Sequence, residues 1–293
     1  MKNKLKIYQY LSLVRYKGIS KFIKNFVKKN SVILDLEDSS KDIFNNKNTN
    51  RLKKLCREGL VYLSEKSNKK INNIFVRINS HKTKYFIDDI NCLKKIIKKK
   101  NFIKGIFVPK VTDYTILEKI NNLINLKKNK ISLVPMIESE KGIKNLENIL
   151  IKDKKNDFIY GVHYGHFDYC LSKKIWPFPE PYHKEYWNIC NILIKLCQIY
   201  KKQFIQTPFP LINKPDLFYG CINYIKTNYK DLSFGMTVVN YNEAYFKIKN
   251  PKKVLRLKMQ GKNKKFKIMF AKKIYKNYIN NKNNKKSFSL TDK

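Results

Sequence analysis

Acidic side chains stand at the end of an apolar run near the start of this chain of 293 residues. Residues 31–39 read Ser-Val-Ile-Leu-Asp-Leu-Glu-Asp-Ser and end in Asp35, Glu37 and Asp38. Alternation along a strand places Asp35 and Glu37 on the same face as Ile33, where a core is expected. A buried carboxylate costs several kcal/mol unless a cation pairs with it. We therefore predict a basic side chain, a metal ion or a functional site beside these two acids.

Other polar residues follow later apolar runs in the same way, namely Arg77, Asn79, Lys110, Glu138 and Asp168. If these runs are the parallel strands of one barrel, their carboxyl ends meet at a single mouth. Five acids and two bases then converge, and this excess of acid favours a divalent cation. Carboxylates that leave several positions open to water and substrate are typical of Mg²⁺ sites. The alternative is that Glu138 forms a salt bridge with Arg77 or Lys110.

Two histidines near Asp168 also allow a zinc interpretation. His163 and His166 lack the i, i+4 spacing of a helical pair, and no cysteine is close enough to complete a closed site. His166 is either a group beside the metal, a substrate contact or proton carrier, or an ordinary loop histidine. The sequence contains no Gly-rich phosphate loop and no G-x-S-x-G motif, which excludes the common nucleotide-binding and serine-hydrolase sites.

The elements that must position these residues follow from the hydrophobic pattern. Short apolar runs alternate with amphipathic stretches, which is typical of βα units around a parallel sheet. We predict strands at 6–13, 32–36, 74–79, 105–111, 131–137, 158–164, 204–207 and 232–238. Helices are predicted at 20–29, 51–64, 85–99, 114–126, 141–150, 184–200, 215–228 and 241–247. Eight units close a barrel, so we expect an α/β fold, a (β/α)₈ TIM barrel, over residues 1–250.

Three finer expectations follow from the same pattern. The helix at 85–99 has Ile87, Ile90, Leu93 and Ile97 spaced for burial. Residues 168–183 are rich in proline and aromatic residues, which indicates a long ordered loop over one end of the barrel. The tail, residues 251–293, has 14 Lys and one Arg against one Asp. We expect it to be a basic C-terminal extension that packs in part and is disordered towards its end.

The chain is strongly basic, with a formal net charge of +41, yet only five of its 63 basic residues are arginine. Arginine is the usual choice for bidentate recognition of phosphates and bases, so lysine on solvated faces explains the charge better than nucleic-acid binding. The six cysteines include no C-x-x-C pair, which favours reduced, mostly buried thiols. No signal-peptide pattern and no apolar run of about 18 residues occurs, so we expect a cytoplasmic protein that contacts no membrane.

Five strand-end motifs together resemble the HpcH/HpaI aldolase and citrate lyase beta-subunit family. They occur in the family's order over about residues 31–250. The motifs are Leu-Asp-Leu-Glu-Asp-Ser at 34–39, Val-Arg-Ile-Asn at 76–79, Gly-Ile-Phe-Val-Pro-Lys-Val at 105–111, Leu-Val-Pro-Met-Ile-Glu-Ser at 133–139 and Gly-His-Phe-Asp at 165–168. The resemblance implies a (β/α)₈ barrel and a homo-oligomer, either a trimer or a hexamer.

The resemblance also implies a chemistry. Members of the family cleave or form carbon–carbon bonds through an enolate, with Mg²⁺, on 2-oxo or hydroxy acids or CoA thioesters, and Mn²⁺ is an alternative metal. Glu138 and Asp168 would be the metal ligands, and Arg77 would stabilise the enolate oxygen and bind substrate. Glu37 and Asp38 would orient Arg77, order water or act as a base, with His166 as a further catalytic candidate. Asn79 and Lys110 would contact the substrate.

The chain departs from the family pattern at both ends of the barrel. The usual Arg-Ser-x-Leu-Phe-x-Pro-Gly opening is replaced by residues 10–18, where Arg15 is the substitute substrate-binding residue. The His-Pro near the last strand is replaced by Gly-Met-Thr at 235–237. Two other functions stay open: hydrolysis of an acyl-CoA thioester by the same metal site, and a basic barrel without catalysis that binds nucleic acid or an acidic partner.

Overall fold

The computed structural model describes residues 5–42, 45–66, 73–100, 102–175, 178–209 and 215–238. The predicted helix at 241–247, the basic extension at 251–293 and the boundary at residue 250 lie outside these ranges. Within them, no helix is both long and apolar enough to cross a membrane.

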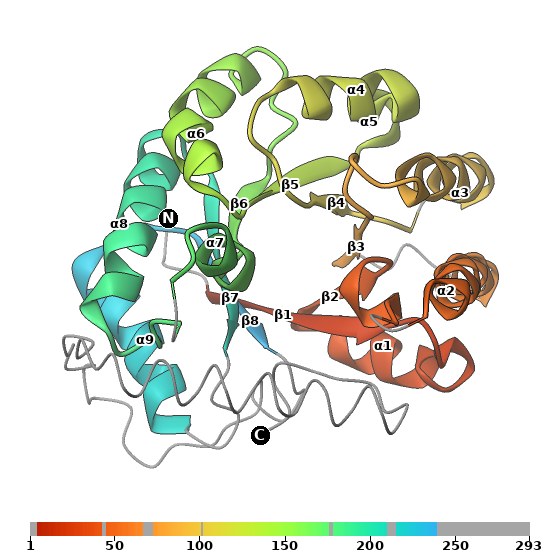
Figure 1. Ribbon diagram of the computed structural model, residues 1–293, viewed down its shortest axis with the longest axis horizontal. Helices are drawn as coiled ribbons and strands as arrows, with labels where there is room; N and C mark the ends of the chain where they lie inside the picture. Colours follow the sequence, from red (N-terminus) through yellow and green to blue (C-terminus); the bar gives the residue numbers. More distant parts are fainter. Residues whose placement is uncertain are drawn as a thin grey trace.

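Eight parallel strands form a closed barrel in chain order, and the first strand pairs with the last, as the sequence pattern predicts. Figure 1 looks into this barrel, with the helices arranged around it. Each predicted strand is present within a few residues of its expected bounds. The strands are β1 (Leu5–Ser12), β2 (Ser31–Asp35), β3 (Ile74–Arg77), β4 (Gly105–Val108), β5 (Ser132–Ile137), β6 (Gly161–Tyr164), β7 (Gln203–Phe209) and β8 (Phe234–Val238).

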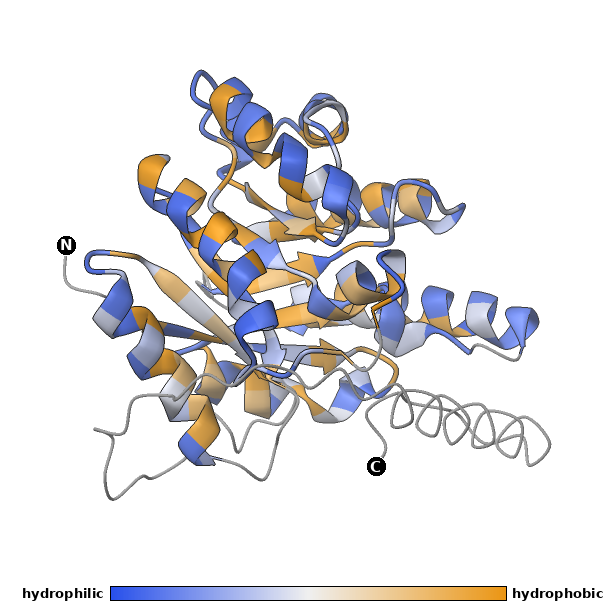
Figure 2. Cartoon of the chain, turned by 60° about the vertical axis from the view of Figure 1, so that its left-hand side comes forward, coloured by the Kyte–Doolittle hydropathy of each residue, from blue (hydrophilic) through white to orange (hydrophobic). Residues whose placement is uncertain are grey.

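The helices cover the outside of the barrel with one apolar face each, and Figure 2 shows their alternating hydrophilic and hydrophobic bands. In α6, the Ser139 side chain caps the N-terminus by accepting a hydrogen bond from the Gly142 amide, 3.1 Å away. The helices are α1 (Ser20–Phe26), α2 (Asn46–Lys66), α3 (Tyr85–Lys100), α4 (Thr115–Ile124), α5 (Leu126–Asn129), α6 (Glu140–Asp153), α7 (His166–Ser172), α8 (Lys184–Ile199) and α9 (Pro215–Asn228), with short 3₁₀ turns η1 (Tyr16–Gly18) and η2 (Asp38–Ser40).

The structure corrects two details of the sequence pattern. The segment predicted to be a long loop, 168–183, instead includes most of α7, because its prolines come only after this helix. In α3, Ile90 and Leu93 are buried as predicted, but Ile87 is 48% exposed. Its position one residue off the apolar stripe turns it towards solvent.

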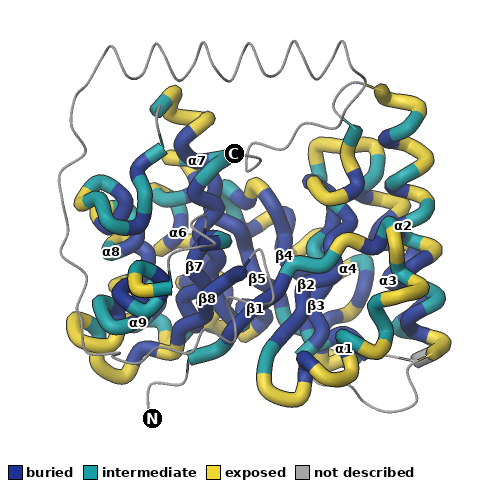
Figure 3. Tube along the Cα trace, turned by 90° about the horizontal axis from the view of Figure 1, so that it is seen from below, coloured by how far each residue is buried: buried dark blue, intermediate teal, exposed yellow. Residues whose placement is uncertain are grey.

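Two apolar cores hold the fold together. The larger lies between the strands and the helices, and Figure 3 shows the strands as the buried centre of the molecule. The smaller lies inside the barrel and consists of Tyr8, Ile33, Phe75, Phe107, Val134, Met136 and Ile205. These side chains fill the barrel as packed layers, so polar side chains further along the same strands are pushed to its mouth.

Candidate active site

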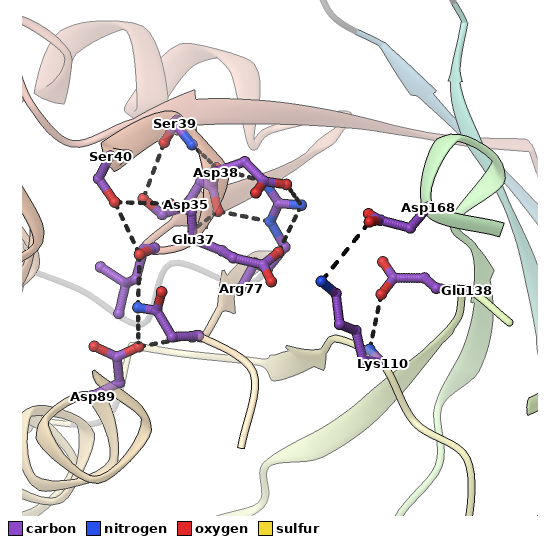
Figure 4. A network of polar contacts seen from close by, with 12 residues as sticks. Asp35, Glu37, Asp38, Ser39, Ser40, Arg77, Asp89, Lys110, Glu138 and Asp168 are labelled. Atoms are coloured by element: carbon purple, nitrogen blue, oxygen red, sulfur yellow. Dashed lines mark hydrogen bonds and ion pairs between the residues drawn. The ribbon is translucent and has the colours of Figure 1, made fainter. Parts of the chain in front are cut away.

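Arg77 at the end of β3 pairs with the acids at the end of β2, so the basic side chain is the alternative that the structure shows beside them. The two strands pair with Asp35 opposite Arg77. The guanidinium donates from Nε to Asp35 Oδ1 and from Nη2 to Asp35 Oδ2, both at 2.7 Å. Its Nη1 lies 3.1 Å from both Glu37 Oε2 and Asp38 Oδ2 (Figure 4). Arg77 therefore forms ion pairs with all three acids that lie at the end of β2 and just after it.

Asp35 is held as a carboxylate on every side. Its oxygens also accept hydrogen bonds from the backbone amides of Glu37 and Ser39, each 3.0 Å away. Burial alone would raise the pKa of Asp35, but the charge of Arg77 and these hydrogen bonds outweigh burial and leave the pKa lowered. The Arg77 guanidinium in turn lies 4.6 Å from the centre of the Tyr10 ring, in cation–π geometry. This pair is a fixed support rather than a titrating group.

A buried network behind the mouth fixes the loop that carries Glu37. Lys53 of α2, only 3% exposed, donates through Nζ to the carbonyl oxygens of Leu36, at 2.8 Å, and Glu37. Asn79 donates through Nδ2 to the same Leu36 oxygen and to Asp89 Oδ2. The Nδ2 group of Asn79 is thus engaged by the scaffold, and the substrate contact predicted for this residue stays a prediction.

Glu138, Lys110 and Asp168 form a second group across the mouth from Arg77 (Figure 4). Glu138 Oε2 accepts the backbone N–H of Lys110 at 2.9 Å, and the Lys110 ammonium lies 3.8 Å from Asp168 Oδ1. Lys110 has a φ of 57°, in the left-handed region that costs energy for a residue with a side chain. Among the described residues Glu138 has no ion pair, so the alternative of a salt bridge to Arg77 or Lys110 does not hold.

Three carboxyl groups of this mouth, those of Glu37, Glu138 and Asp168, have raised pKa values, and burial is the largest cause for each. Burial, with Asp38 and Asp35 adding to it and Arg77 opposing it, raises the pKa of Glu37 to about 8. Burial, Glu37 and Asp168 together raise the pKa of Glu138 well above its usual range. Burial also raises the pKa of Asp168, against the effect of Lys110. The site holds more negative charge than its own bases neutralise.

This donor set fits a magnesium ion. Within the described ranges no three His, Cys, Asp or Glu side chains are grouped closely enough to enclose a metal. Mg²⁺ is nevertheless commonly bound by one or two carboxylates with water in the other positions. Glu138 and Asp168 are two such carboxylates, and a cation between them would relieve the repulsion that raises their pKa values.

Two predicted site residues lie apart from this geometry. His166 begins α7 and is 4% exposed, with Nδ1 bonded to the Tyr164 hydroxyl at 2.9 Å and Nε2 to the Pro179 carbonyl at 2.7 Å. Burial lowers the pKa of His166 to about 4. Arg15 is exposed in the turn after β1 and has no hydrogen bond or ion pair among the described residues. Both nitrogens of the His166 ring are thus engaged within the protein, and the catalytic role predicted for it stays a prediction.

The sequence patterns do not indicate Tyr10 or Lys53 as residues of this site, and they indicate His163 only as part of the zinc interpretation. Tyr10 lies under Arg77, and His163 lies inside the barrel with its ring 6.3 Å from the Tyr10 ring. The signal was present, since alternation with Tyr8 and with Gly161 points both side chains inward. Lys53 could not be distinguished by sequence from the many solvated lysines around it.

Comparison with known proteins agrees with the barrel and its motifs. The family model of HpcH/HpaI aldolase/citrate lyase matches residues 20–200. A search of curated proteins finds no match. The structure of RipC from Yersinia pestis has 16% identity and a TM-score of 0.59, covering 83% of this chain and 94% of its own.

Two citrate lyase structures are also similar. The citrate lyase beta subunit from M. tuberculosis, complexed with oxaloacetate and magnesium, has 13% identity and a TM-score of 0.57, covering 79% of this chain and 90% of its own. A citrate lyase from Burkholderia xenovorans LB400 has 10% identity and a TM-score of 0.61, covering 82% of this chain and 74% of its own. At these identities the structural likeness supports the fold.

Proposed function

Because the chain belongs to the HpcH/HpaI aldolase/citrate lyase family, a family of carbon–carbon lyases, we propose a specific reaction for it. It is a Mg²⁺-dependent lyase or aldolase that acts through an enolate on a small 2-oxo or hydroxy acid or its CoA thioester. The observation that supports this most directly is the arrangement of the mouth. A buried guanidinium on β3 faces two under-neutralised carboxylates, Glu138 and Asp168, across the same opening.

Each charged residue of the mouth has a separate role in the proposed reaction. Glu138 and Asp168 would hold Mg²⁺, whose contribution when bound is to polarise a carbonyl oxygen as a Lewis acid. Three of the five N–H groups of Arg77 donate to Asp35 and Asp38, and Nη1 also forms an ion pair with Glu37, so the second N–H group of Nη2 remains for the oxygen where negative charge develops. Glu37, with a pKa of about 8, can hold and release a proton near neutral pH. Lys110, half exposed, can meet a substrate carboxylate.

Metal binding tests this function first. We expect Glu138→Gln and Asp168→Asn each to weaken Mg²⁺ binding at least tenfold by isothermal titration calorimetry, because each removes a charged ligand. Glu140→Gln is the matched control, since Glu140 lies two residues from Glu138 but is exposed and paired with Lys173. Folded variants of Glu138 and Asp168 that bind Mg²⁺ as tightly as the wild type would contradict the proposal.

Enolate formation is the second test. Mg²⁺-dependent exchange of the methyl protons of pyruvate in D₂O, followed by NMR, is expected for the wild type and is lost in Glu138→Gln. Product analysis on an acyl-CoA separates lyase activity from thioester hydrolysis, because hydrolysis leaves the carbon skeleton intact. Formation of the intact acid alone would favour the thioesterase.

We further propose an alternative metal, an oligomeric state and a cellular location for this protein. The same oxygen ligands suit Mn²⁺, so we expect it to replace Mg²⁺ in both assays. We expect a trimer or hexamer by light scattering, and a cytoplasmic location.

A further inference from the structure

Lys53 of α2 is the only lysine that is buried in the described part of the chain, where it is 3% exposed. Placing an ammonium group in the interior is costly, so lysine is almost never fully buried unless its charge has a use there. The other described lysines lie at least partly in solvent. The position of Lys53 therefore calls for an explanation that the solvated lysines around it do not need.

The ammonium group of Lys53 ends at the turn that follows β2 and carries Glu37. Its Nζ donates to the main-chain oxygen of Leu36 at 2.8 Å and to that of Glu37. The same Nζ lies 5.6 Å from the centre of the Tyr85 ring on α3, within the range of a cation–π contact. Lys53 thus connects two helices of the outer layer, α2 and α3, to the residue that holds and releases a proton in the proposed reaction.

These two main-chain oxygens do not depend on Lys53 for a hydrogen bond. The Ser40 hydroxyl lies 2.9 Å from the Leu36 oxygen and 3.0 Å from the Glu37 oxygen. Asn79 Nδ2 also donates to the Leu36 oxygen at 2.8 Å, and the Ser40 amide donates to the Glu37 oxygen at 3.3 Å. An apolar side chain at position 53 would therefore leave neither oxygen without a donor. What Lys53 adds to this turn is a positive charge.

This charge lies where acid is in excess. Burial lowers the pKa of Lys53, and four negative side chains oppose that effect, namely Asp35, Glu37, Asp89 and Asp38. Arg77 forms ion pairs with three of these acids, whereas Lys53 forms none in the described part of the chain. A second positive charge behind the turn therefore offsets repulsion that Arg77 leaves, and it does so without occupying the Glu37 carboxylate.

The turn is held from behind, and the side chain of Glu37 points to the mouth. Asp89 of α3, which is fully buried, accepts the Asn79 backbone N–H at 2.8 Å and its Nδ2 at 2.7 Å. Figure 4 shows Asp89 on the side of Glu37 that faces away from Glu138. In front, Glu37 Oε2 lies 3.1 Å from Arg77 Nη1. Contacts to the main chain thus fix the place of Glu37, while its carboxylate stays at the mouth.

We propose that Lys53 is a positioning residue, whose buried ammonium group holds the turn after β2 so that the Glu37 carboxylate stays in place beside Arg77. Lys53 touches no reacting group and acts only through Glu37. This inference rests on the proposed lyase function, and it adds a residue of the outer helical layer that controls the rate of proton transfer. A displacement of about 1 Å can slow an enzyme about a hundredfold, so the effect on kcat is measurable.

Lys53→Met in the full chain tests this role, because methionine keeps the apolar stem and removes the ammonium group. With Mg²⁺, we expect kcat for exchange of the methyl protons of pyruvate in D₂O to fall at least tenfold. KM for pyruvate and the Mg²⁺ affinity by calorimetry should stay within about twofold of the wild type, because the groups that bind them are unchanged. An unchanged kcat, or a loss that appears only in KM or in Mg²⁺ affinity, would overturn the proposal.

Lys53→Arg is the conservative variant. It keeps the positive charge and the N–H donors, and we expect it to restore kcat to within about threefold of the wild type. A Lys53→Arg protein as slow as Lys53→Met would contradict the role that we assign to the charge.

Lys202→Met is the matched control, because the Lys202 side chain is only 10% exposed but lies just before β7, at the opposite end of the barrel. Its loss leaves the fully buried Asp153 without a cation, so we expect the melting temperature to fall by roughly 5 °C or more with kcat unchanged. Lys53→Met breaks no ion pair of the described residues, so its melting temperature should stay within roughly 3 °C of the wild type. A Lys53→Met protein with a lower melting temperature and the kcat of the wild type would overturn the proposal.

Amide hydrogen exchange gives a readout that needs no catalysis. The amides of Glu37 and Ser39 donate to Asp35, each at 3.0 Å, so they report on the turn directly. We expect both to exchange at least tenfold faster in Lys53→Met than in the wild type or in Lys202→Met, measured by NMR. Unchanged amide rates would overturn the positioning role, even where the wild type exchanges pyruvate protons. An absence of pyruvate exchange in the wild type would overturn the proposed function, and the amide rates would still decide whether Lys53 holds the turn.

Discussion

The barrel mouth has a charged half, on β2 to β5 and α7, and a neutral half, on β1, β6 and β8, and the two halves differ in how their buried polar atoms are paired. In the charged half, Asp35 is satisfied by Arg77 and by two backbone amides, so its partners are in place before any ligand arrives. In the neutral half, the polar atoms of His163 and Thr237 have no partner among the described residues. The charged half is therefore stabilised by its own ion pairs and hydrogen bonds, whereas the side chains of His163 and Thr237 add no hydrogen bond to the described part of the chain.

The largest expected effect comes from removing the centre of the charged half. Arg77→Met leaves Asp35 buried without its cation, and breaking one side of a buried ion pair typically costs about 3–5 kcal/mol. We expect the free energy of unfolding, measured in urea at pH 7, to fall by this amount and the lyase activity to disappear. Lys173→Met is the control, because its pair with Glu140 is exposed and should contribute under about 1 kcal/mol. Similar losses in both variants would mean that the Arg77–Asp35 pair contributes no more to the free energy of unfolding than an exposed ion pair does.

This contrast also marks how far the sequence could predict the site. The barrel followed from its eight apolar runs, and the need for a cation beside Asp35 followed from alternation in one strand. In the structure Arg77 supplies this cation, because Asp35 and Arg77 lie opposite each other at the ends of the neighbouring strands β2 and β3. The partners of Asn79 were not predictable, since Asp89 lies on a helix whose rotation against the barrel depends on packing.

His163 and His166 show where alternation along a strand stops predicting the direction of a side chain. Alternation along β6 (Gly161–Tyr164) points His163 inward, whereas His166 lies two residues past the strand, at the first position of α7. The sequence pattern predicts no helix at residue 166, because the predicted strand ends at 164 and the predicted loop begins at 168. A pattern of period two holds only while the strand continues.

The boundary between the halves lies at Gly165, and filling it should produce the next largest effect. A Cβ at this position would lie 2.3 Å from Cγ of Glu138, far inside van der Waals contact. Gly165→Ala is therefore expected to cost about 3 kcal/mol, near the upper end for overpacking, and to weaken Mg²⁺ binding by displacing the carboxylate. Gly18→Ala, where a Cβ meets nothing within 4 Å, should be close to neutral in thermal unfolding. Unchanged Mg²⁺ affinity in Gly165→Ala would show that Glu138 is not held against this glycine.

The neutral half should make the protein sensitive to acid. The pKa of His163 is about 3 in the folded chain against 6.5 unfolded, so the unfolded state binds the proton first as pH falls. Stability contributed by the neutral ring is full above pH 6.5 and is lost as pH falls towards 3, by about 1.4 kcal/mol per pH unit. Between pH 7 and pH 5 we expect the wild type to lose about 2 kcal/mol more than His163→Phe in urea titrations. His166 is present in both proteins, so the difference isolates His163, and parallel losses would contradict its neutral burial.

The smallest expected effect on stability is that of a substitution at Lys110. The same substitution tests how charge near the proposed metal ligands affects Mg²⁺ binding. Its pair with Asp168 spans 3.8 Å and both side chains are nearly half exposed, so Lys110→Met should change the free energy of unfolding by less than about 0.5 kcal/mol. The variant also removes the positive charge nearest the two proposed metal ligands, while the backbone N–H that holds Glu138 remains. Repulsion between two unit charges about 4 Å apart in water is about 1 kcal/mol, and therefore about 2 kcal/mol for a divalent cation, so Mg²⁺ should bind up to about thirtyfold more tightly by calorimetry. If Lys110 also meets the substrate carboxylate, KM for pyruvate in condensation rises in the same variant. Weaker Mg²⁺ binding would instead mean that Lys110 organises the metal site.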